Sequence, residues 1–89
     1  MLSKQVEVIN KLGLHARASA KLVEVANKFT CNIYLNKDNK KANAKSIMNV
    51  MMLAASRGSI LTITVDGIDE VHALQAIEDL ITGKFGELE

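Results

Sequence analysis

The chain changes periodicity at Asn10-Lys11-Leu12-Gly13-Leu14-His15-Ala16-Arg17-Ala18-Ser19-Ala20. Before this stretch, polar and apolar residues alternate over Gln5–Ile9, a pattern typical of a half-buried strand. After it, apolar residues recur at helical spacing from Ala16 to about Lys28, which predicts an amphipathic helix. The stretch is therefore a strand-to-helix junction, and its glycine is a natural place for the chain to turn.

His15, one of only two histidines, lies in this junction. The first N–H groups of a helix have no intrahelical partner, and with the helix dipole they favour an anion at that end. Arg17 adds a cation whose forked donors suit phosphate. A neutral imidazole carries a nitrogen lone pair near physiological pH, so it can attack a phosphoryl group. We hypothesise that His15 is a phosphoryl acceptor; the alternative is a surface histidine near a helix start.

Strand and helix patterns continue to the end of the chain. The further predicted elements are a strand over 31–36, a turn over 37–40, a short edge strand over 41–44, a helix over 47–56 that Ser46 caps and Arg57-Gly58 ends, a strand over 61–65, and a helix that Asp69 caps and Gly83 ends. The order βαββαβα is most economically packed as an α+β open-faced sandwich, a four-stranded antiparallel sheet with three helices on one face. We expect residues 1–89 to form a single domain, with Phe85 pinning the short tail.

Composition and charge exclude several kinds of function. The net charge is +1 and aromatic residues make up 3%, which argues against a nucleic-acid binder. Cys31 is the only cysteine, so no intrachain disulfide is possible, and His15 and His72 lie too far apart in sequence to suggest zinc. We expect no metal and no cofactor, and we interpret His72 as a surface residue.

The first residues lack the apolar core of a signal peptide, and the longest apolar run, Val50–Ala55, is too short to span a bilayer. We therefore expect a cytoplasmic protein without membrane insertion. The chain also lacks a Gly-x-Ser-x-Gly elbow and a glycine-rich nucleotide loop. A hydrolase needs a nucleophile, a base and an orienting group. Their absence favours a carrier, completed by its partners, over an enzyme.

The 47–56 helix has almost no polar face. A short helix beside one sheet cannot be buried from every direction, so some of its apolar side chains should be exposed. An exposed apolar patch typically marks a partner site, and methionine suits a surface that meets several partners. The alternatives are a helix covered by its neighbours and a dimer interface. The candidate docking residues are Ile47, Met48, Met51 and Met52.

Two motifs carry a resemblance to a known family. Gly13-Leu14-His15-Ala16-Arg17, followed downstream by Lys45-Ser46-Ile47-Met48, resembles HPr, the histidine-containing phosphocarriers of the bacterial phosphoenolpyruvate-dependent phosphotransferase system, in their proteobacterial form. The resemblance covers essentially the whole chain. It implies that His15 is phosphorylated on Nδ1, that Arg17 orients and neutralises the phosphate, and that the helix after Ser46 docks enzyme I and HPr kinase/phosphorylase. A proline is usual after the arginine, and Ala18 replaces it here, which we expect to change local rigidity without loss of activity.

The resemblance also implies partners. His15 would receive phosphate from phospho-enzyme I and pass it to the A component of an enzyme II in sugar transport. Ser46 would be a regulatory phosphorylation site for HPr kinase/phosphorylase, although a serine N-cap is also what the helix needs structurally. The first alternative is a regulatory phosphocarrier of a nitrogen-related or permease-less branch. The second is a binding module that uses the 47–56 helix, with His15 incidental.

Overall fold

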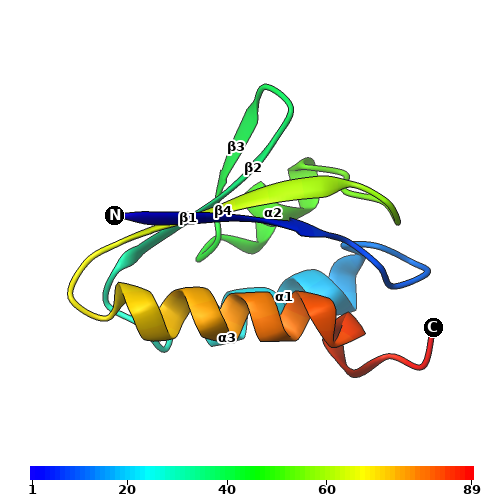
Figure 1. The fold of residues 1–89 in the computed structure, drawn as a ribbon. Coiled ribbons are helices and arrows are strands. Elements are labelled where there is room, and N and C mark those ends of the chain that lie inside the picture. Colours follow the sequence, from blue (N-terminus) through cyan, green and yellow to red (C-terminus); the bar gives the residue numbers. More distant parts are fainter.

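The computed structural model describes residues 1–89, and its elements follow the predicted order. The strands form one antiparallel sheet in the order β1-β4-β2-β3. The helices pack on one face, and Figure 1 shows α1 and α3 side by side beneath the sheet. The α+β open-faced sandwich is thereby confirmed. The elements are β1 (Leu2–Glu7), α1 (Ala16–Ala26), β2 (Asn32–Lys37), β3 (Lys40–Asn43), α2 (Ile47–Met52), β4 (Ile60–Asp66), α3 (Glu70–Thr82) and a 3-10 turn, η1 (Lys84–Gly86).

The core lies between the sheet and the helices. In β4, the buried Leu61, Ile63 and Val65 alternate with Thr62 and Thr64 on the open face of the sheet. All three join a cluster of 21 buried apolar residues that also includes side chains at helical spacing. These are Ala18, Leu22 and Ala26 of α1 and Ala73, Ile77 and Ile81 of α3.

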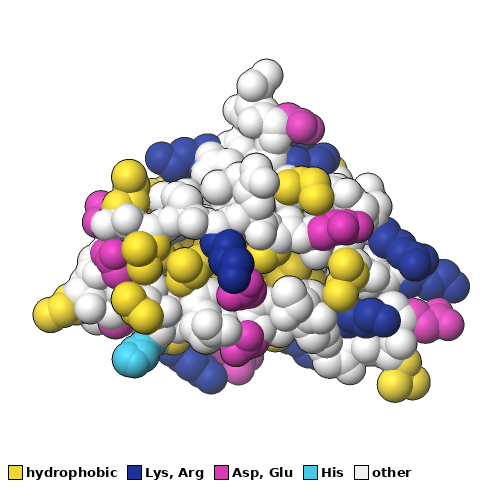
Figure 2. Space-filling model, in the orientation of Figure 1, with side chains coloured by type: hydrophobic (Ala, Val, Ile, Leu, Met, Phe, Trp, Pro, Cys, Tyr) yellow, Lys and Arg dark blue, Asp and Glu magenta, His cyan; other side chains and the backbone are white.

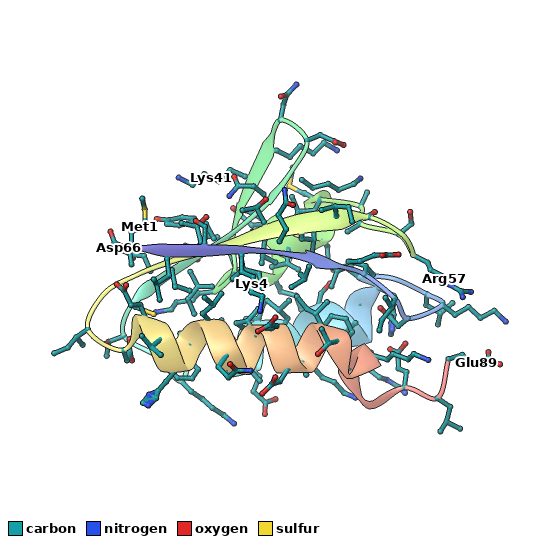
Figure 3. The ribbon with its side chains drawn as sticks, in the orientation of Figure 1. Met1, Lys4, Lys41, Arg57, Asp66 and Glu89 are labelled. Atoms are coloured by element: carbon teal, nitrogen blue, oxygen red, sulfur yellow. The ribbon has the colours of Figure 1, made fainter.

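β1 begins at Leu2 rather than at Gln5 and ends before the predicted Ile9. Each of its residues pairs with β4, so main-chain hydrogen bonds carry the strand through a polar stretch. Lys4 points toward α3 in Figure 3, and its Nζ lies 2.5 Å from a carboxylate oxygen of Glu78. An inward-pointing charge on an edge strand protects it from pairing with another sheet. Because Lys4 is a polar residue at an inward-facing position, the alternation of polar and apolar residues does not reveal the first part of this strand.

α2 ends at Met52, so the predicted stop at Arg57-Gly58 is wrong. Ala54 has a left-handed φ of 51°, which cannot continue the helix. Lys37, from β2, donates its Nζ hydrogens to the carbonyls of Leu53 (3.2 Å) and Ala54 (3.4 Å). A cation therefore satisfies the free carbonyls at the end of α2. It comes from another element, so local sequence patterns could not reveal it.

The other boundaries differ less from prediction. α1 ends at Ala26 rather than at about Lys28. The next residue, Asn27, is the C-cap, and its side chain donates to the Val23 carbonyl at 2.9 Å. Asp69 does occupy the N-cap position of α3, but its side chain caps nothing there. Instead its carboxylate accepts hydrogen bonds from the N–H groups of Thr30 (2.8 Å) and Cys31 (2.9 Å), at the start of β2. These bonds, the one from Thr30 foremost, lower the pKa of Asp69 from 3.8 to about 2.

Exposed large apolar side chains gather at two places. Four of them lie on α2, and three more, Met1, Ile68 and Val71, lie near the start of α3, where Figure 2 shows hydrophobic side chains at one end of the molecule. The large apolar side chains that are exposed elsewhere are Leu2, Leu12, Ile60 and Leu88. None of the helices combines the length and apolar character needed to cross a membrane.

Candidate functional site

Close packing against the segment after α2 holds the loop that leads into α1. Gly13 has a φ of +64°, and a Cβ there would lie 2.4 Å from the carbonyl oxygen of Ala55. The next residue, Leu14, donates its N–H to that same oxygen at 2.8 Å, and its carbonyl accepts the Ser19 hydroxyl at 3.1 Å. His15 follows as the N-cap of α1. Glycine is therefore required at 13, and the position of His15 depends on it.

The first turn of α1 offers three unpaired donors. Ser19 makes the first helical hydrogen bond, to the carbonyl of His15 at 2.9 Å. The N–H groups of Ala16, Arg17 and Ala18 have no hydrogen-bond partner in the structure. They point out of the helix at its positive end, beside the His15 side chain, and such donors favour an anion. The structure therefore has the unpaired N–H groups on which the expectation of an anion at this junction rests.

The His15 ring contacts a carboxylate from the C-terminal tail. Nε2 of His15 hydrogen-bonds Oε2 of Glu87, and the two side chains are 27% and 19% exposed. Oε1 of Glu87 accepts a hydrogen bond from Nδ2 of the fully buried Asn10 at 3.0 Å. The bond from His15, aided by Asn10 and by the charge of Lys21, lowers the pKa of Glu87 against the effect of burial. The carboxylate is therefore ionised at neutral pH and acts only as an acceptor.

The two ring nitrogens consequently differ. Because an ionised carboxylate cannot donate, the nitrogen that faces Glu87 carries the hydrogen. No hydrogen bond engages Nδ1 of His15. In a neutral imidazole with Nε2–H, the lone pair lies on Nδ1.

Basic side chains surround the ring. Arg17 is exposed and makes no ion pair, and Lys21 donates its Nζ hydrogen to the Phe85 carbonyl at 2.7 Å. Together they border a hollow of about 650 Å³ that runs from the end of the first loop to the tail. Its lining residues are Lys11, Leu12, His15, Arg17, Lys21, Gly86, Glu87, Leu88 and Glu89. The hollow is lined by one imidazole, three cationic side chains and two carboxylates, and the imidazole and cations suit a phosphoryl group.

Ser46 occupies the N-cap of α2, as predicted. Its Oγ accepts hydrogen bonds from the N–H of Asn49 at 3.3 Å and from the Asn49 side chain at 3.1 Å. Only Val50 of α2 is buried. The predicted exposure of the apolar side chains of α2 is confirmed, with exposed fractions of 40% for Ile47, 66% for Met48, 41% for Met51 and 70% for Met52.

The structure does not bring Ser46 and His15 together. Lys45, next to Ser46, donates its Nζ hydrogen to the Phe29 carbonyl beyond the C-terminal end of α1 at 2.6 Å. At the other end, the segment that follows α2 reaches Leu14, just before α1 begins, through the Ala55 carbonyl. α1 has 11 residues and is about 16 Å long, so the two helices run antiparallel and the two side chains lie at opposite ends of α1.

Sequence reasoning missed Glu87 and Asn10. For the tail, the sequence predicts only that Phe85 pins it, and Phe85 is indeed buried. A carboxylate in the tail gave no signal, because its partner His15 lies 72 positions away. Asn10 stood at the edge of an apolar segment, and its complete burial appears only in the fold.

Comparisons with known proteins point in one direction. The family model for the PTS HPr component phosphorylation site matches residues 2–83. The chain is 48% identical over 87 residues to phosphocarrier protein HPr of Neisseria meningitidis serogroup A, and 49% identical over 87 residues to that of Xylella fastidiosa, covering 98% of this chain and of each relative. It superposes on a crystal structure of HPr from Thermoanaerobacter tengcongensis with a TM-score of 0.96 and 47% identity, over 100% of both chains.

Proposed function

Because the chain belongs to the HPr family of phosphotransferase-system phosphocarriers, we propose that residues 1–89 form one cytoplasmic phosphocarrier domain that receives a phosphoryl group on Nδ1 of His15. The observation that carries this proposal is the contact between Nε2 of His15 and Glu87, which leaves Nδ1 as the ring nitrogen with a free lone pair. That nitrogen belongs to the N-cap residue of a helix whose first N–H groups are unpaired.

The transfer needs few groups from this chain. The Nδ1 lone pair attacks the phosphorus atom of the phosphorylated donor and forms an N–P bond. The bond between phosphorus and the donor atom breaks, and its electron pair stays on the donor. The unpaired N–H groups of α1 and the free guanidinium of Arg17 offset the negative charge that arrives. The reverse sequence delivers the phosphoryl group to an acceptor.

The partners supply the remaining chemistry. We propose enzyme I as the donor and the A component of an enzyme II, in sugar transport, as the acceptor. The exposed side chains of α2 support a docking surface at Ile47, Met48, Met51 and Met52. Met51 and Met52 end the helix, shortly before the Ala55 carbonyl that accepts the N–H of Leu14.

Ser46 is proposed as a regulatory site for HPr kinase/phosphorylase. Its hydroxyl lies at a helix N-terminus, which tolerates phosphate well. A phosphate there would add a charge of about −2 beside the apolar docking surface, where it disfavours a partner that buries those side chains. The position of Ser46, far from His15, supports an effect on docking rather than on the chemistry at the ring.

The proposal is tested by incubation with enzyme I and labelled phosphoenolpyruvate. An acid-labile phosphate should appear on the wild-type protein and be absent from His15→Ala. Labelling of the His15→Ala protein, or no labelling of the wild type, would show that His15 is not the acceptor.

A further inference from the structure

The carboxylate of Glu87 and the buried side-chain amide of Asn10 form a chain of hydrogen bonds that ends at His15. Each oxygen of Glu87 has its own partner: Oε2 meets Nε2 of His15, and Oε1 accepts from Nδ2 of Asn10 at 3.0 Å. The same Nδ2 group also donates to the carbonyl of Gly13 at 2.8 Å. Asn10 is fully buried, so this amide ties the carboxylate to the loop that carries His15.

The tail is fixed in place around this carboxylate. Phe85 is buried in the core at 1% exposure, and its carbonyl accepts the Nζ hydrogen of Lys21 at 2.7 Å. Lys84 and Phe85 both have left-handed φ angles, 58° and 56°, which turn the chain back after α3. Non-glycine residues adopt this conformation only where their surroundings require it. Beyond Glu87, the N–H of Lys11 donates to the main-chain oxygen of Glu89 at 2.9 Å, and Figure 1 shows the tail turning toward the loop before α1.

We propose that Glu87, held by Asn10, is a positioning residue for phosphoryl transfer that fixes His15 as the Nε2–H tautomer and stabilises the positive charge that forms on its ring. The inference rests on the proposed role of His15. When Nδ1 attacks phosphorus, the ring gains a bond while Nε2 keeps its hydrogen, so the imidazole becomes cationic. A carboxylate on the far nitrogen then faces this charge directly, as the aspartate does in a Ser-His-Asp triad.

The competing explanation is structural: Glu87 merely ties the tail to the loop. The two explanations differ in what they predict for the ring of the unphosphorylated protein. If Glu87 only holds the tail, its loss can leave the tautomer of His15 unchanged. If Glu87 fixes the tautomer, its loss must let the ring hydrogen occupy either nitrogen.

The first test is therefore spectroscopic and needs no partner enzyme. Two-bond 1H–15N spectra of protein labelled with 15N-histidine, recorded in alkaline buffer, report which ring nitrogen carries the hydrogen. We expect His15 to be almost entirely the Nε2–H form in the wild type and to shift toward the mixture of free histidine in Glu87→Ala. Glu87→Gln keeps a carbonyl oxygen as acceptor and should restore part of the Nε2–H form.

Glu78 provides a matched control. Its carboxylate is also in an ion pair, with Lys4, and it is 17% exposed against 19% for Glu87, but it lies on α3 away from the ring. Glu78→Ala should leave the tautomer of His15 unchanged. An unchanged tautomer in Glu87→Ala, with a far-UV spectrum like that of the wild type, would overturn the proposal; so would an equal shift in Glu78→Ala.

The second test measures transfer from phospho-enzyme I. Glu87→Ala should lower the maximal rate of phosphoryl transfer at least roughly tenfold, the smallest effect usual when a hydrogen-bond partner of a metal-bound histidine is lost. The concentration of carrier at half-maximal rate should stay the same, because the side chain of Glu87 bonds Asn10 and His15 and no residue of α2. An unchanged maximal rate overturns the positioning role alone, whereas a wild-type protein that accepts no phosphate overturns the proposed function and leaves the tautomer measurement valid.

Discussion

Gly13 and Ala55 approach so closely that a Cβ at position 13 would lie 2.4 Å from the Ala55 carbonyl oxygen. The contact joins the loop before His15 to the segment after α2, so it links the proposed phosphorylation site to the proposed docking helix. Alanine at 13 would meet both a left-handed φ of +64° and this clash. We expect Gly13→Ala to cost about 3 kcal/mol of unfolding free energy, measured by urea denaturation.

Gly58 allows the cost of the positive φ to be measured separately from the cost of the clash. It also has a positive φ, +91°, but a Cβ there would have no atom within 4 Å. Gly58→Ala should therefore cost only about 1 kcal/mol, the price of the backbone conformation. Equal losses in the two variants would contradict the close approach at Gly13.

Asp69 should make stability depend on acid. Its pKa is lowered from 3.8 to about 2 in the folded protein, mainly by the hydrogen bond from Thr30. The carboxylate therefore stabilises the fold fully above pH 3.8, and this contribution disappears as the pH falls toward 2. Urea midpoints measured across this range should fall less steeply in Asp69→Asn than in the wild type.

Asp79 offers a control for that experiment, since its carboxylate accepts only from the Gln75 side chain on the same helix, at 2.7 Å. Asp79→Asn should keep the wild-type slope. Part of the slope should persist even in Asp69→Asn, because the pKa values of Glu70 and Glu87 are also lowered, by the N–H of Gly67 and by His15 respectively. A wild-type slope in Asp69→Asn would mean that the bonds to Thr30 and Cys31 do not hold the ionised form.

Lys37 should stabilise the end of α2. Lys37→Met removes the donor to the Leu53 and Ala54 carbonyls and should cost about 1 kcal/mol in urea denaturation. Lys40 lies in the same hairpin and its side chain makes no hydrogen bond, so Lys40→Met should change stability by less than about 0.5 kcal/mol. Equal effects would mean that the charge of the hairpin matters, and not the contact with α2.

Met48 should be needed for docking rather than for folding. It is 66% exposed, so Met48→Gln should leave the urea midpoint almost unchanged. If enzyme I buries this side chain, Met48→Gln should raise the carrier concentration needed for half-maximal transfer about tenfold. Val71, also 66% exposed but on α3, is the matched control, and Val71→Gln should transfer normally. A larger defect in Val71→Gln would move the docking surface to α3.

The capping role of Ser46 can be tested separately from its proposed regulatory role. Ser46→Ala removes the acceptor for the Asn49 N–H and should cost about 1 kcal/mol, while Ser46→Asp keeps a cap. With ATP and HPr kinase/phosphorylase, the wild type should gain an acid-stable phosphate that Ser46→Ala lacks. The Asp variant should slow transfer from enzyme I through weaker docking; transfer at the wild-type rate would argue against regulation at this position.

Local patterns were sufficient for much of the molecule. The alternation in β4 and the helical spacing of Leu22 and Ile77 both reflect one buried face, so the order of elements and the layered fold could be predicted. His15 could be singled out because the junction that carries it is also local. The features that escaped prediction depend on contacts between distant positions, such as Lys37 at the end of α2 and Glu87 behind the ring. In the sequence alone, Lys37 and Glu87 look like ordinary surface charges, because the contacts that distinguish them form only in the fold.

The most direct measurement is the site of the phosphoryl group on the ring. Protein labelled with 15N-histidine is phosphorylated by enzyme I and phosphoenolpyruvate, and the 31P–15N coupling identifies the bonded nitrogen. We expect a one-bond coupling to Nδ1 of His15, with Nε2 still facing Glu87. A coupling to Nε2, or a phosphohistidine signal in His15→Ala, would contradict this expectation.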